Sequence, residues 1–243
     1  MYGGNTIGQS VLVLVLRLSV GSVKRPDIIY PFKHTYLIAK LTASITQKLI
    51  QMPNTPNIHP TAKIMKGAII DGEVTIGENT FIGSGAVVVS NGGNITIGNN
   101  TVVMENAVVR SAEKFNCSIG SNVLVGPKAC ITGAVIQNSC FIATNGTIFH
   151  GAELLSGTVL AVNAIVHINT FCPANTFVPI AHIAFGNPAK IYSPAEIMEF
   201  HADLRKAGGF VNYVYGIDAT GLANAEIYQQ LTEKFISMVS TGD

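Results

Sequence analysis

The fold is decided by residues 58–88, which read IHPTAKIMKGAIIDGEVTIGENTFIGSGAVV. A branched aliphatic residue recurs at every sixth position of this stretch without a gap, at Ile58, Ile64, Ile70, Ile76, Ile82 and Val88. Six residues is neither the period of an α-helix nor the alternation of a single strand. The step therefore predicts a solenoid in which each unit of six supplies one short strand and one corner.

The same step continues along the chain in three further runs, from Ile97 to Val109, from Ile119 to Ile131 and from Ile136 to Val178. Three units make one coil of about eighteen residues, so the region 58–184 holds about seven coils. Residues 89–96 and 111–118 interrupt the step, and we expect them to form loops outside the coil. The step from Ile131 to Ile136 is one residue short, which predicts a local slip.

The corners carry a second pattern, because small and left-handed-tolerant residues recur there. Glycine often follows the inward aliphatic residue, at Gly77, Gly83, Gly98, Gly120 and Gly126. Asparagine suits left-handed corner conformations, and it stands at Asn79, Asn99, Asn100, Asn122, Asn145, Asn163 and Asn175. The pattern favours tight turns between short strands.

Three regions follow from this reading: a basic N-terminal extension over 1–51, the solenoid over 52–190 and a helical tail over 191–243. The tail begins with Ser193-Pro194-Ala195-Glu196, which is typical of a helix start. Apolar residues at helical spacing predict helices after Ser193, over Asn224–Met238 and over Tyr36–Ile50. We expect these helices to pack outside the solenoid, to cap it or to stabilise a trimer.

The N-terminal extension holds six of the fifteen Lys and Arg residues and a single acidic residue, Asp27. Such a basic, acid-poor segment is typical of a mitochondrial leader. A folded extension is the interpretation that we favour, and a true start at Met52 is a further alternative. The net charge is +1, which does not suggest nucleic-acid binding, and no apolar run is long enough to span a membrane.

The four cysteines, Cys117, Cys130, Cys140 and Cys172, have no CxxC spacing. The chain also lacks the composition of a small disulfide-rich domain. We therefore interpret them as reduced thiols packed in a core.

Five blocks resemble the γ-class carbonic anhydrase family of the hexapeptide-repeat superfamily over residues 57–192. They read GEVTIGENTFIGSGAVV, IGNNTVVMENAVVR, IGSNVLVGPKA, FIATNGTIFHGA and HIAFGNPAKI. The resemblance implies an all-β solenoid that is a left-handed parallel β-helix of about seven coils, with flanking N- and C-terminal α-helices. It also implies a homotrimer. Active members of that family hold zinc through three histidines at the trimer interface.

This chain differs from the family at all three zinc-ligand positions, which correspond to Arg110, Pro127 and Thr132. Proline offers no side-chain ligand, and arginine is a permanent cation where zinc would be. We therefore expect no zinc, no other cofactor and no zinc-dependent CO2 hydration. Arg110 is expected to pair with Glu105, within one chain or across the subunit interface, either as a purely structural ion pair or as part of a cationic pocket for a small anion.

Two histidines are candidate catalytic residues. His150 and His167 lie seventeen residues apart, so we expect them at neighbouring levels of one corner region. Hexapeptide acyltransferases use a histidine base to deprotonate an acceptor hydroxyl or amine. A different metal site that adds His182 is another interpretation, and a third is that these histidines are hydrogen-bonded surface groups.

The segment FGNPAK offers a second feature of the acyltransferases, because it resembles the turn in their final coil. On that reading Gly186, Asn187 and Lys190 contact acyl-CoA. Two function classes therefore remain. One is a γ-carbonic-anhydrase-like trimeric binding or assembly protein, which would belong to a larger assembly if mitochondrial. The other is an acyl-CoA-dependent acyltransferase. We expect a cytoplasmic location, or a mitochondrial one if residues 1–51 are a leader.

Overall fold

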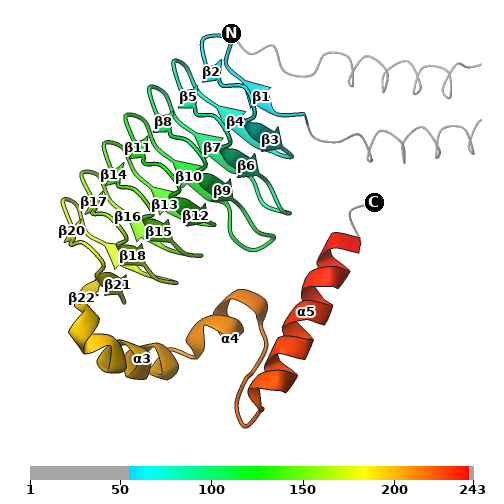
Figure 1. Ribbon diagram of the computed structural model, residues 1–243, viewed down its shortest axis with the longest axis vertical. Coiled ribbons are helices and arrows are strands. Elements are labelled where there is room, and N and C mark those ends of the chain that lie inside the picture. The colour runs from blue at the N-terminus through cyan, green and yellow to red at the C-terminus, as the bar shows by residue number, and fades with distance from the viewer. Residues whose placement is uncertain (1–54, 241–243) are drawn as a thin grey trace, which may run out of the picture. The chain divides into compact units, whose positions relative to one another are not determined.

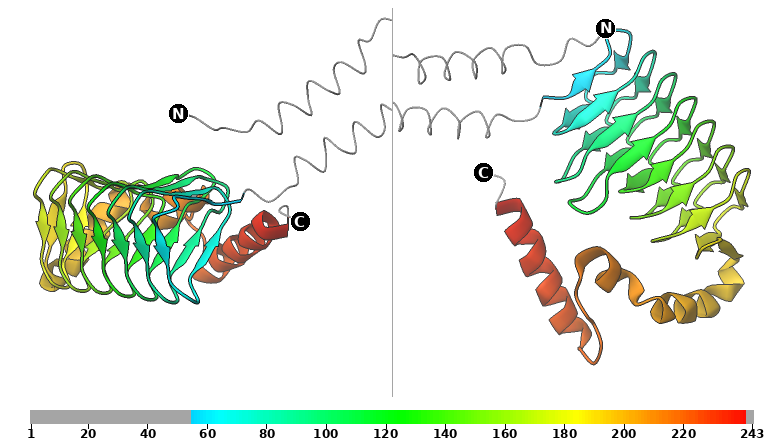
Figure 2. Two further views of the ribbon diagram at one scale, coloured as in Figure 1. Left: turned by 90° about the horizontal axis from the view of Figure 1, so that it is seen from above. Right: turned by 180° about the vertical axis from the view of Figure 1, so that it is seen from behind.

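The computed structural model describes residues 55–240, and over residues 57–192 these form a parallel β-solenoid of seven coils (Figure 1). The expected all-β solenoid is confirmed, and its coil number is consistent with the left-handed β-helix. Figure 2 shows the coils stacked in succession, each contributing one strand to each sheet. The predicted helix over 36–50 and the whole extension over 1–51 lie outside the described residues.

The strands form three parallel sheets, in which neighbours come from successive coils. Sheet A contains β1 (Asn57–Ile58), β4 (Val74–Ile76), β7 (Ile95–Ile97), β10 (Cys117–Ile119), β13 (Val135–Ile136), β16 (Glu153–Leu154) and β19 (Phe171–Cys172). Sheet B contains β2 (Lys63–Ile64), β5 (Phe81–Ile82), β8 (Val102–Val103), β11 (Leu124–Val125), β14 (Phe141–Ile142), β17 (Val159–Leu160) and β20 (Phe177–Val178).

Sheet C is the longest and ends in one antiparallel strand. It contains β3 (Ile69–Asp71), β6 (Val87–Val89), β9 (Val108–Arg110), β12 (Cys130–Thr132), β15 (Thr147–Ile148), β18 (Ile165–Val166), β21 (Ile183–Phe185) and the antiparallel β22 (Lys190–Tyr192). This sheet carries the candidate site on its outer face.

The core consists of the aliphatic residues that recur every sixth position. They stack in register from coil to coil, as in the pairing of Ile142 with Val125 and with Leu160. All three side chains are fully buried. The predicted inward positions are confirmed from Ile76 to Val178, whereas Ile58 and Ile64 on the first coil are 38% and 37% exposed. Burial of a side chain of this size contributes about 1.5–3 kcal/mol.

Left-handed backbone conformations occur at the corners, as the asparagines predict. Asn79, Asn100, Asn122, Asn145, Asn163 and Asn175 all have φ between 53° and 61°. Asn99 was also expected there, but it is not among the residues with positive φ. Its side chain instead accepts a hydrogen bond from the Glu78 amide of the preceding coil at 2.9 Å.

The two predicted loops and the slip are confirmed, with narrower bounds. The chain leaves the coil after β6 and rejoins it at β7, and it does so again between β9 and β10. Ser90 and Ser111 both donate to the carbonyl of Gly93, which fixes the first loop against the next coil. The slip falls at Gly133, where φ is +55°.

The tail contains a short 3-10 turn, η1 (Pro194–Glu196), and the helices α3 (Ile197–Lys206), α4 (Gly209–Tyr215) and α5 (Asn224–Ser240). The backbone N–H of Ser193 donates to Glu196 Oε2 at 2.8 Å, as the capping-box pattern predicts. α4 is a departure from the sequence prediction. Gly208 and Gly209 end α3 with φ of +89° and +75°, but the chain then starts a second helix.

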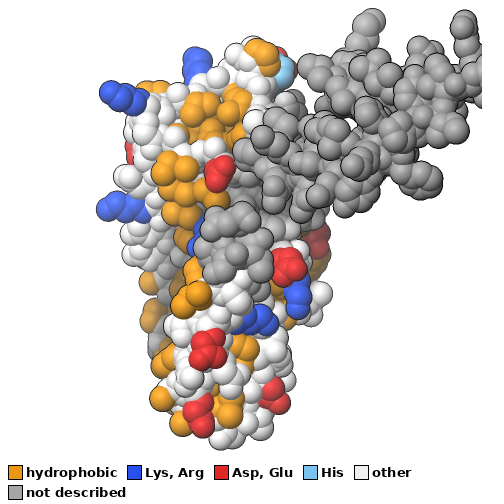
Figure 3. All heavy atoms as spheres, turned by 90° about the vertical axis from the view of Figure 1, so that its right-hand side faces the viewer, with side chains coloured by type: hydrophobic (Ala, Val, Ile, Leu, Met, Phe, Trp, Pro, Cys, Tyr) orange, Lys and Arg blue, Asp and Glu red, His pale blue; other side chains and the backbone are white. Residues whose placement is uncertain are grey.

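Apolar side chains are found on the surface of the protein as well as in its core. In the face shown in Figure 3, hydrophobic side chains run between isolated Lys, Arg, Asp and Glu side chains. On the first coil, for example, Ile69 is 55% exposed. Within residues 55–240 no helix is long and apolar enough to cross a membrane.

Candidate functional site

Two of the three family zinc-ligand positions lie side by side on sheet C. Arg110 ends β9 and pairs in register with Thr132, which ends β12. Both side chains follow the inward residue of their strand, so they point away from the core and are partly buried. The register continues through Phe149 to His167 and Phe185 on the next three coils. The outer face of sheet C therefore carries one column of functional side chains.

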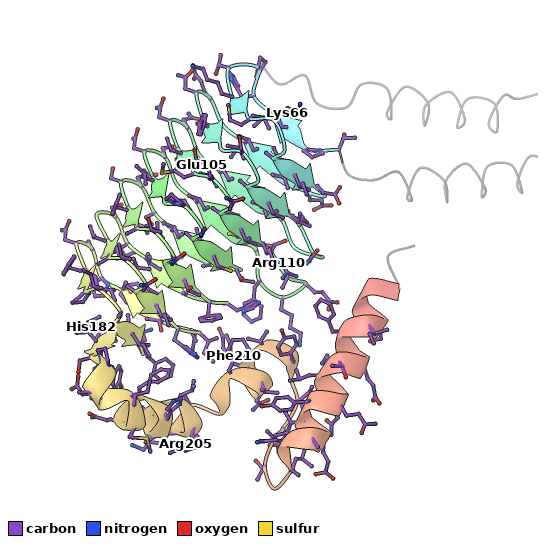
Figure 4. All side chains as sticks on the ribbon, viewed as in Figure 1. Lys66, Glu105, Arg110, His182, Arg205 and Phe210 are labelled. Carbon is purple, nitrogen blue, oxygen red and sulfur yellow. The ribbon has the colours of Figure 1, made fainter. Side chains whose placement is uncertain are left out.

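Pro127 and Glu105 lie elsewhere, at the corners that lead from sheet B to sheet C. The expected ion pair between Glu105 and Arg110 is not formed within the described chain, where the salt bridges are Lys190–Glu199 and Lys206–Asp203. The reason is geometric, because Glu105 precedes β9 and Arg110 ends it. Figure 4 shows the two side chains at opposite ends of that strand.

His150 and His167 lie on consecutive coils, as predicted. His167 directly follows β18, and His150 comes two residues after β15. The amide of Asn169 donates to the carbonyl of His150 at 3.0 Å, which ties the two corners together. His150 is only 8% exposed. His150 is therefore not a surface group, and His167 is partly buried.

Helices α3 and α4 supply an aromatic cover over both imidazoles. The His167 ring lies 5.1 Å from Phe200 and 6.0 Å from Phe210, measured between ring centroids. The His150 ring lies 5.3 Å from Phe115 and 6.3 Å from Phe210. Figure 4 shows Phe210 of α4 facing the solenoid. Phe210 thus contacts both candidate bases.

The two imidazoles are held in the neutral state by this environment. Burial, with a smaller contribution from the nearby Arg110 charge, lowers the pKa of His150 to about 4. Burial also lowers the pKa of His167 to about 4, with a smaller contribution from His201. Both Nδ1 atoms are buried and have no hydrogen-bond partner in the described part of the chain. Neutral imidazoles with free nitrogens can accept a proton.

The alternative metal site with His182 is not formed. His182 precedes β21, at the opposite end of a sheet C strand from His167, and its Nδ1 donates to the carbonyl of Ile180 at 2.8 Å. Among residues 55–240 there is no group of three or more His, Cys, Asp or Glu side chains that could hold a metal ion.

The FGNPAK segment forms the turn between β21 and β22. Gly186 has φ of +104°, and its carbonyl accepts from the Phe171 amide at 3.0 Å. Lys190 donates from Nζ to Glu199 Oε1 of α3 at 2.5 Å and lies 4.5 Å from the Tyr192 ring centroid. Within this chain, Lys190 therefore anchors α3 to the last coil.

An apolar groove of about 540 Å³ runs along sheet B and the corner that follows it. Pro127, Phe141, Val162, Phe177 and Ile180 are among the residues that line it. Phe177 and Ile180 are 59% and 64% exposed. Large apolar side chains exposed to this extent are typical of an interaction surface.

Three aromatic residues at the site were missed by the sequence analysis. Phe115 lies in the loop between β9 and β10, and Phe210 and Tyr213 lie on α4. The spacing of three between Phe210 and Tyr213, directly after a glycine pair, was the available signal for α4. The contact of Phe210 with His150 and His167, which lie 60 and 43 residues earlier, depends on how the tail docks, which no local pattern encodes.

Comparison with known proteins adds one family match. The family model described as bacterial transferase hexapeptide (six repeats) matches residues 55–90, which is well under half of the chain. No curated protein matches the sequence.

Solved structures resemble the chain at low identity. A hexapeptide transferase family protein from Anaplasma phagocytophilum is 23% identical over 63% of this chain and 89% of that chain, with a TM-score of 0.32. A UDP-N-acetylglucosamine acyltransferase from Campylobacter jejuni is 20% identical over 72% and 81%, with a TM-score of 0.37. At these values the likenesses bear on neither activity nor substrate.

The family match and the register agree on the repeat itself. The matched residues 55–90 span the first two coils, and the same pairing of inward residues continues through the seventh coil. The solenoid of this chain is therefore built from hexapeptide repeats, and its first two coils match those of the bacterial transferases.

Proposed function

We propose that this protein is an acyl-CoA-dependent acyltransferase whose base is an imidazole on the outer face of sheet C. The single observation that carries the proposal is the pair formed by His150 and His167. Both are held neutral by burial, and each has a buried Nδ1 without a partner among the described residues. Buried polar atoms without partners are rare in folded proteins and often mark functional sites.

The reaction needs little more than such a base. The imidazole takes a proton from the hydroxyl or amine of an acceptor as that group attacks the thioester carbonyl of acyl-CoA. A new ester or amide bond forms, and the carbon–sulfur bond breaks. The proton on the imidazole then neutralises the departing thiolate of CoA. A base with a lowered pKa remains unprotonated at neutral pH, and so it is ready for the first step.

The described part of the chain offers two further supports. The matched family model is that of a transferase hexapeptide, and the apolar groove on sheet B has room for an extended chain such as a pantetheine arm. We propose that the groove faces a neighbouring copy in a homotrimer, and that acyl-CoA lies between the two copies. Gly186, Asn187 and Lys190 are the proposed contacts in the last coil.

The test combines binding with turnover. Acetyl-CoA should raise the melting temperature of the protein, and release of free CoA should depend on an added amine or alcohol. His167→Gln and His150→Gln each remove one proposed base, and His59→Gln is the control because His59 is exposed on the first coil. Loss of turnover in at least one of the two variants, with the control unchanged, supports the proposal. No acetyl-CoA shift with the native protein rejects it.

A second function rests on Arg110 and Thr132. They are adjacent in register at the positions where the γ-carbonic anhydrase family has zinc ligands. On this proposal the protein is a γ-carbonic-anhydrase-like trimer that binds a ligand or joins an assembly without hydrating CO2. Absence of a CoA shift, together with a stable trimer and co-purification of one defined partner, favours it. Stoichiometric zinc with CO2 hydration contradicts both proposals.

A further inference from the structure

Three polar side chains converge around Gly133, the site of the slip in the repeat. The Gly133 amide donates to the carbonyl of Arg110 at 2.8 Å, and the Gly133 carbonyl accepts from the Gly151 amide at 2.8 Å. Arg110, Thr132 and His150 therefore lie on three consecutive coils. A β-carbon at Gly133 would come within 3.4 Å of His150 Cδ2. The imidazole thus lies directly against this short corner.

The polar atoms of these three side chains have few hydrogen-bond partners within the described chain. His150 is 8% exposed, and its Nδ1 is buried without a partner. Among the described residues, the guanidinium of the partly buried Arg110 forms no hydrogen bond or ion pair. The Thr132 hydroxyl has only the Cys130 Sγ atom near it, at 3.9 Å. Polar groups in such positions ordinarily have partners.

No acidic side chain is adjacent to Arg110 in its column on sheet C, where the neighbours are Val89 and Thr132. The nearest acidic residue in the same column is Asp71, which pairs with Val89, and Val89 in turn pairs with Arg110. Two strand spacings are about 10 Å. Glu105 lies at the other end of β9. The charge of Arg110 reaches His150 strongly enough to lower the pKa of the imidazole, so the two groups share one electropositive neighbourhood.

We infer that Arg110, Thr132 and His150 form a binding site for a small oxyanion, a carboxylate or a phosphate group. The guanidinium presents two parallel N–H donors to such a group. The Thr132 hydroxyl and an imidazole N–H add donors from the next two coils. Phe115 and Tyr213 cover the site, with ring centroids 5.5 Å apart. The inference does not depend on acyl transfer, because the same donors bind a free anion.

Anion binding has a protonation signature that a merely structural arginine lacks. A bound anion offsets the charge of Arg110 and stabilises the imidazolium form of His150. Arg110 is the charged group that acts on this imidazole, and the loop that packs Phe115 against it also carries Glu113 and Lys114, which are both exposed. The pKa of His150 should therefore rise when the site is filled, and binding should take up a proton below neutral pH.

The experiment is a histidine NMR titration of the full chain with sodium acetate and, separately, with sodium phosphate. We expect a saturable shift of the His150 Cε1–H resonance with at least one anion, and an upward shift of its midpoint pH. Saturation with acetate alone assigns a carboxylate ligand, and saturation with phosphate alone assigns a phosphoryl ligand. If neither anion shifts the resonance saturably, the inference is wrong.

Variants separate this site from general charge effects. Arg110→Gln should weaken the preferred anion by about tenfold or more, the usual loss of a charged hydrogen bond. Arg110→Lys keeps the charge but loses the paired donors, so its affinity for the anion should lie between that of the native protein and that of Arg110→Gln. Arg205→Gln is the matched control because Arg205 is exposed on α3. Unchanged affinity in a folded Arg110→Gln protein overturns the assignment. Acyl transfer is read separately, by release of CoA.

Discussion

The hydroxyl of Tyr213 on α4 lies directly against the backbone of Gly151, the residue that follows His150. A β-carbon at Gly151 would overlap that hydroxyl. The contact joins the tail to the fifth coil at the point where both the candidate base and the proposed anion site are found. α4 can therefore cover the imidazoles only because residue 151 has no side chain.

Replacement of Gly151 by alanine should undock α4. Gly151 has φ of +72°, so alanine adds backbone strain as well as the overlap with Tyr213. We expect a total loss of about 2–5 kcal/mol in the free energy of unfolding, from strain of roughly 1–2 kcal/mol and overpacking of roughly 1–3 kcal/mol. Urea denaturation gives the loss, and faster proteolysis within α4 reports the undocking.

Gly67→Ala is the matched control for this change. Gly67 has φ of +85°, but a β-carbon there meets only one backbone atom, at 3.9 Å. It should therefore show the strain without the overlap. Equal losses in the two variants, or unaltered proteolysis of α4 in Gly151→Ala, would show that the Tyr213 contact does not hold the tail.

The stability of the fold should decrease as the pH falls from about 6.5 to about 4. Burial lowers the pKa of His150 and His167 in the folded chain to about 4 from an ordinary value of 6.5. The unfolded chain therefore binds protons first, and stability is greatest above pH 6.5. Each imidazole should cost on the order of 1 kcal/mol between pH 7 and pH 5.

The paired substitution His150→Gln with His167→Gln should flatten this dependence, because glutamine does not titrate. Urea denaturation at pH 7, 6 and 5 measures the slope. His59→Gln, at an exposed position of the first coil, should leave the slope as it is. A slope that persists in the double variant would mean that other groups carry it.

The solenoid could be predicted from the sequence because the same six-residue step occurs in every coil. Each inward position from Ile76 to Val178 is filled by a buried aliphatic residue or by Cys172, so a local six-residue step fixes the strands and the register together. The one-residue slip after Ile131 could be predicted for the same reason. A deviation from a strict period is as visible as the period itself.

The environment of the site could not be read in this way. The sequence places His150 and His167 on neighbouring coils, but their burial comes from Phe115, Phe200 and Phe210, which lie in a loop and in the tail. Gly208 and Gly209 indicate the end of a helix and not the direction in which the chain continues. The protonation state of the histidines therefore depends on tertiary packing and not on the repeat.

Cys130 should be the reactive thiol of the folded protein. Cys117, Cys140 and Cys172 are buried, whereas Cys130 is partly exposed on sheet C. Burial raises the pKa of Cys117 to about 11 and that of Cys172 to about 12, and a thiol that stays protonated is a poor nucleophile. A disulfide-exchange reagent at pH 8 should label one thiol rapidly and the other three only after unfolding. Rapid labelling that survives in Cys130→Ser would contradict this.

A ladder of hydroxyl groups holds the corner between sheets A and B, and Thr101 is its central member. Thr101 is fully buried. Its hydroxyl donates to the Gly120 carbonyl at 2.8 Å and accepts from the Val123 amide at 3.2 Å. Its own amide donates to the Thr80 hydroxyl at 3.3 Å. Through its hydroxyl and its backbone amide, Thr101 thus links three successive coils.

Thr101→Val keeps the shape of the side chain and removes both bonds of the hydroxyl. The amide of Val123 and the carbonyl of Gly120 would then be buried without this partner, which should cost about 1–3 kcal/mol in the free energy of unfolding. Thr101→Ser retains the hydroxyl and loses only a methyl group, at about 0.8 kcal/mol. Urea denaturation distinguishes the two. If valine costs no more than serine, packing and not hydrogen bonding stabilises this corner. Valine already occupies the equivalent position one coil later, at Val123, where its amide donates to the Thr101 hydroxyl. The corner therefore has room for a valine side chain, and a loss in Thr101→Val reports the missing hydrogen bonds.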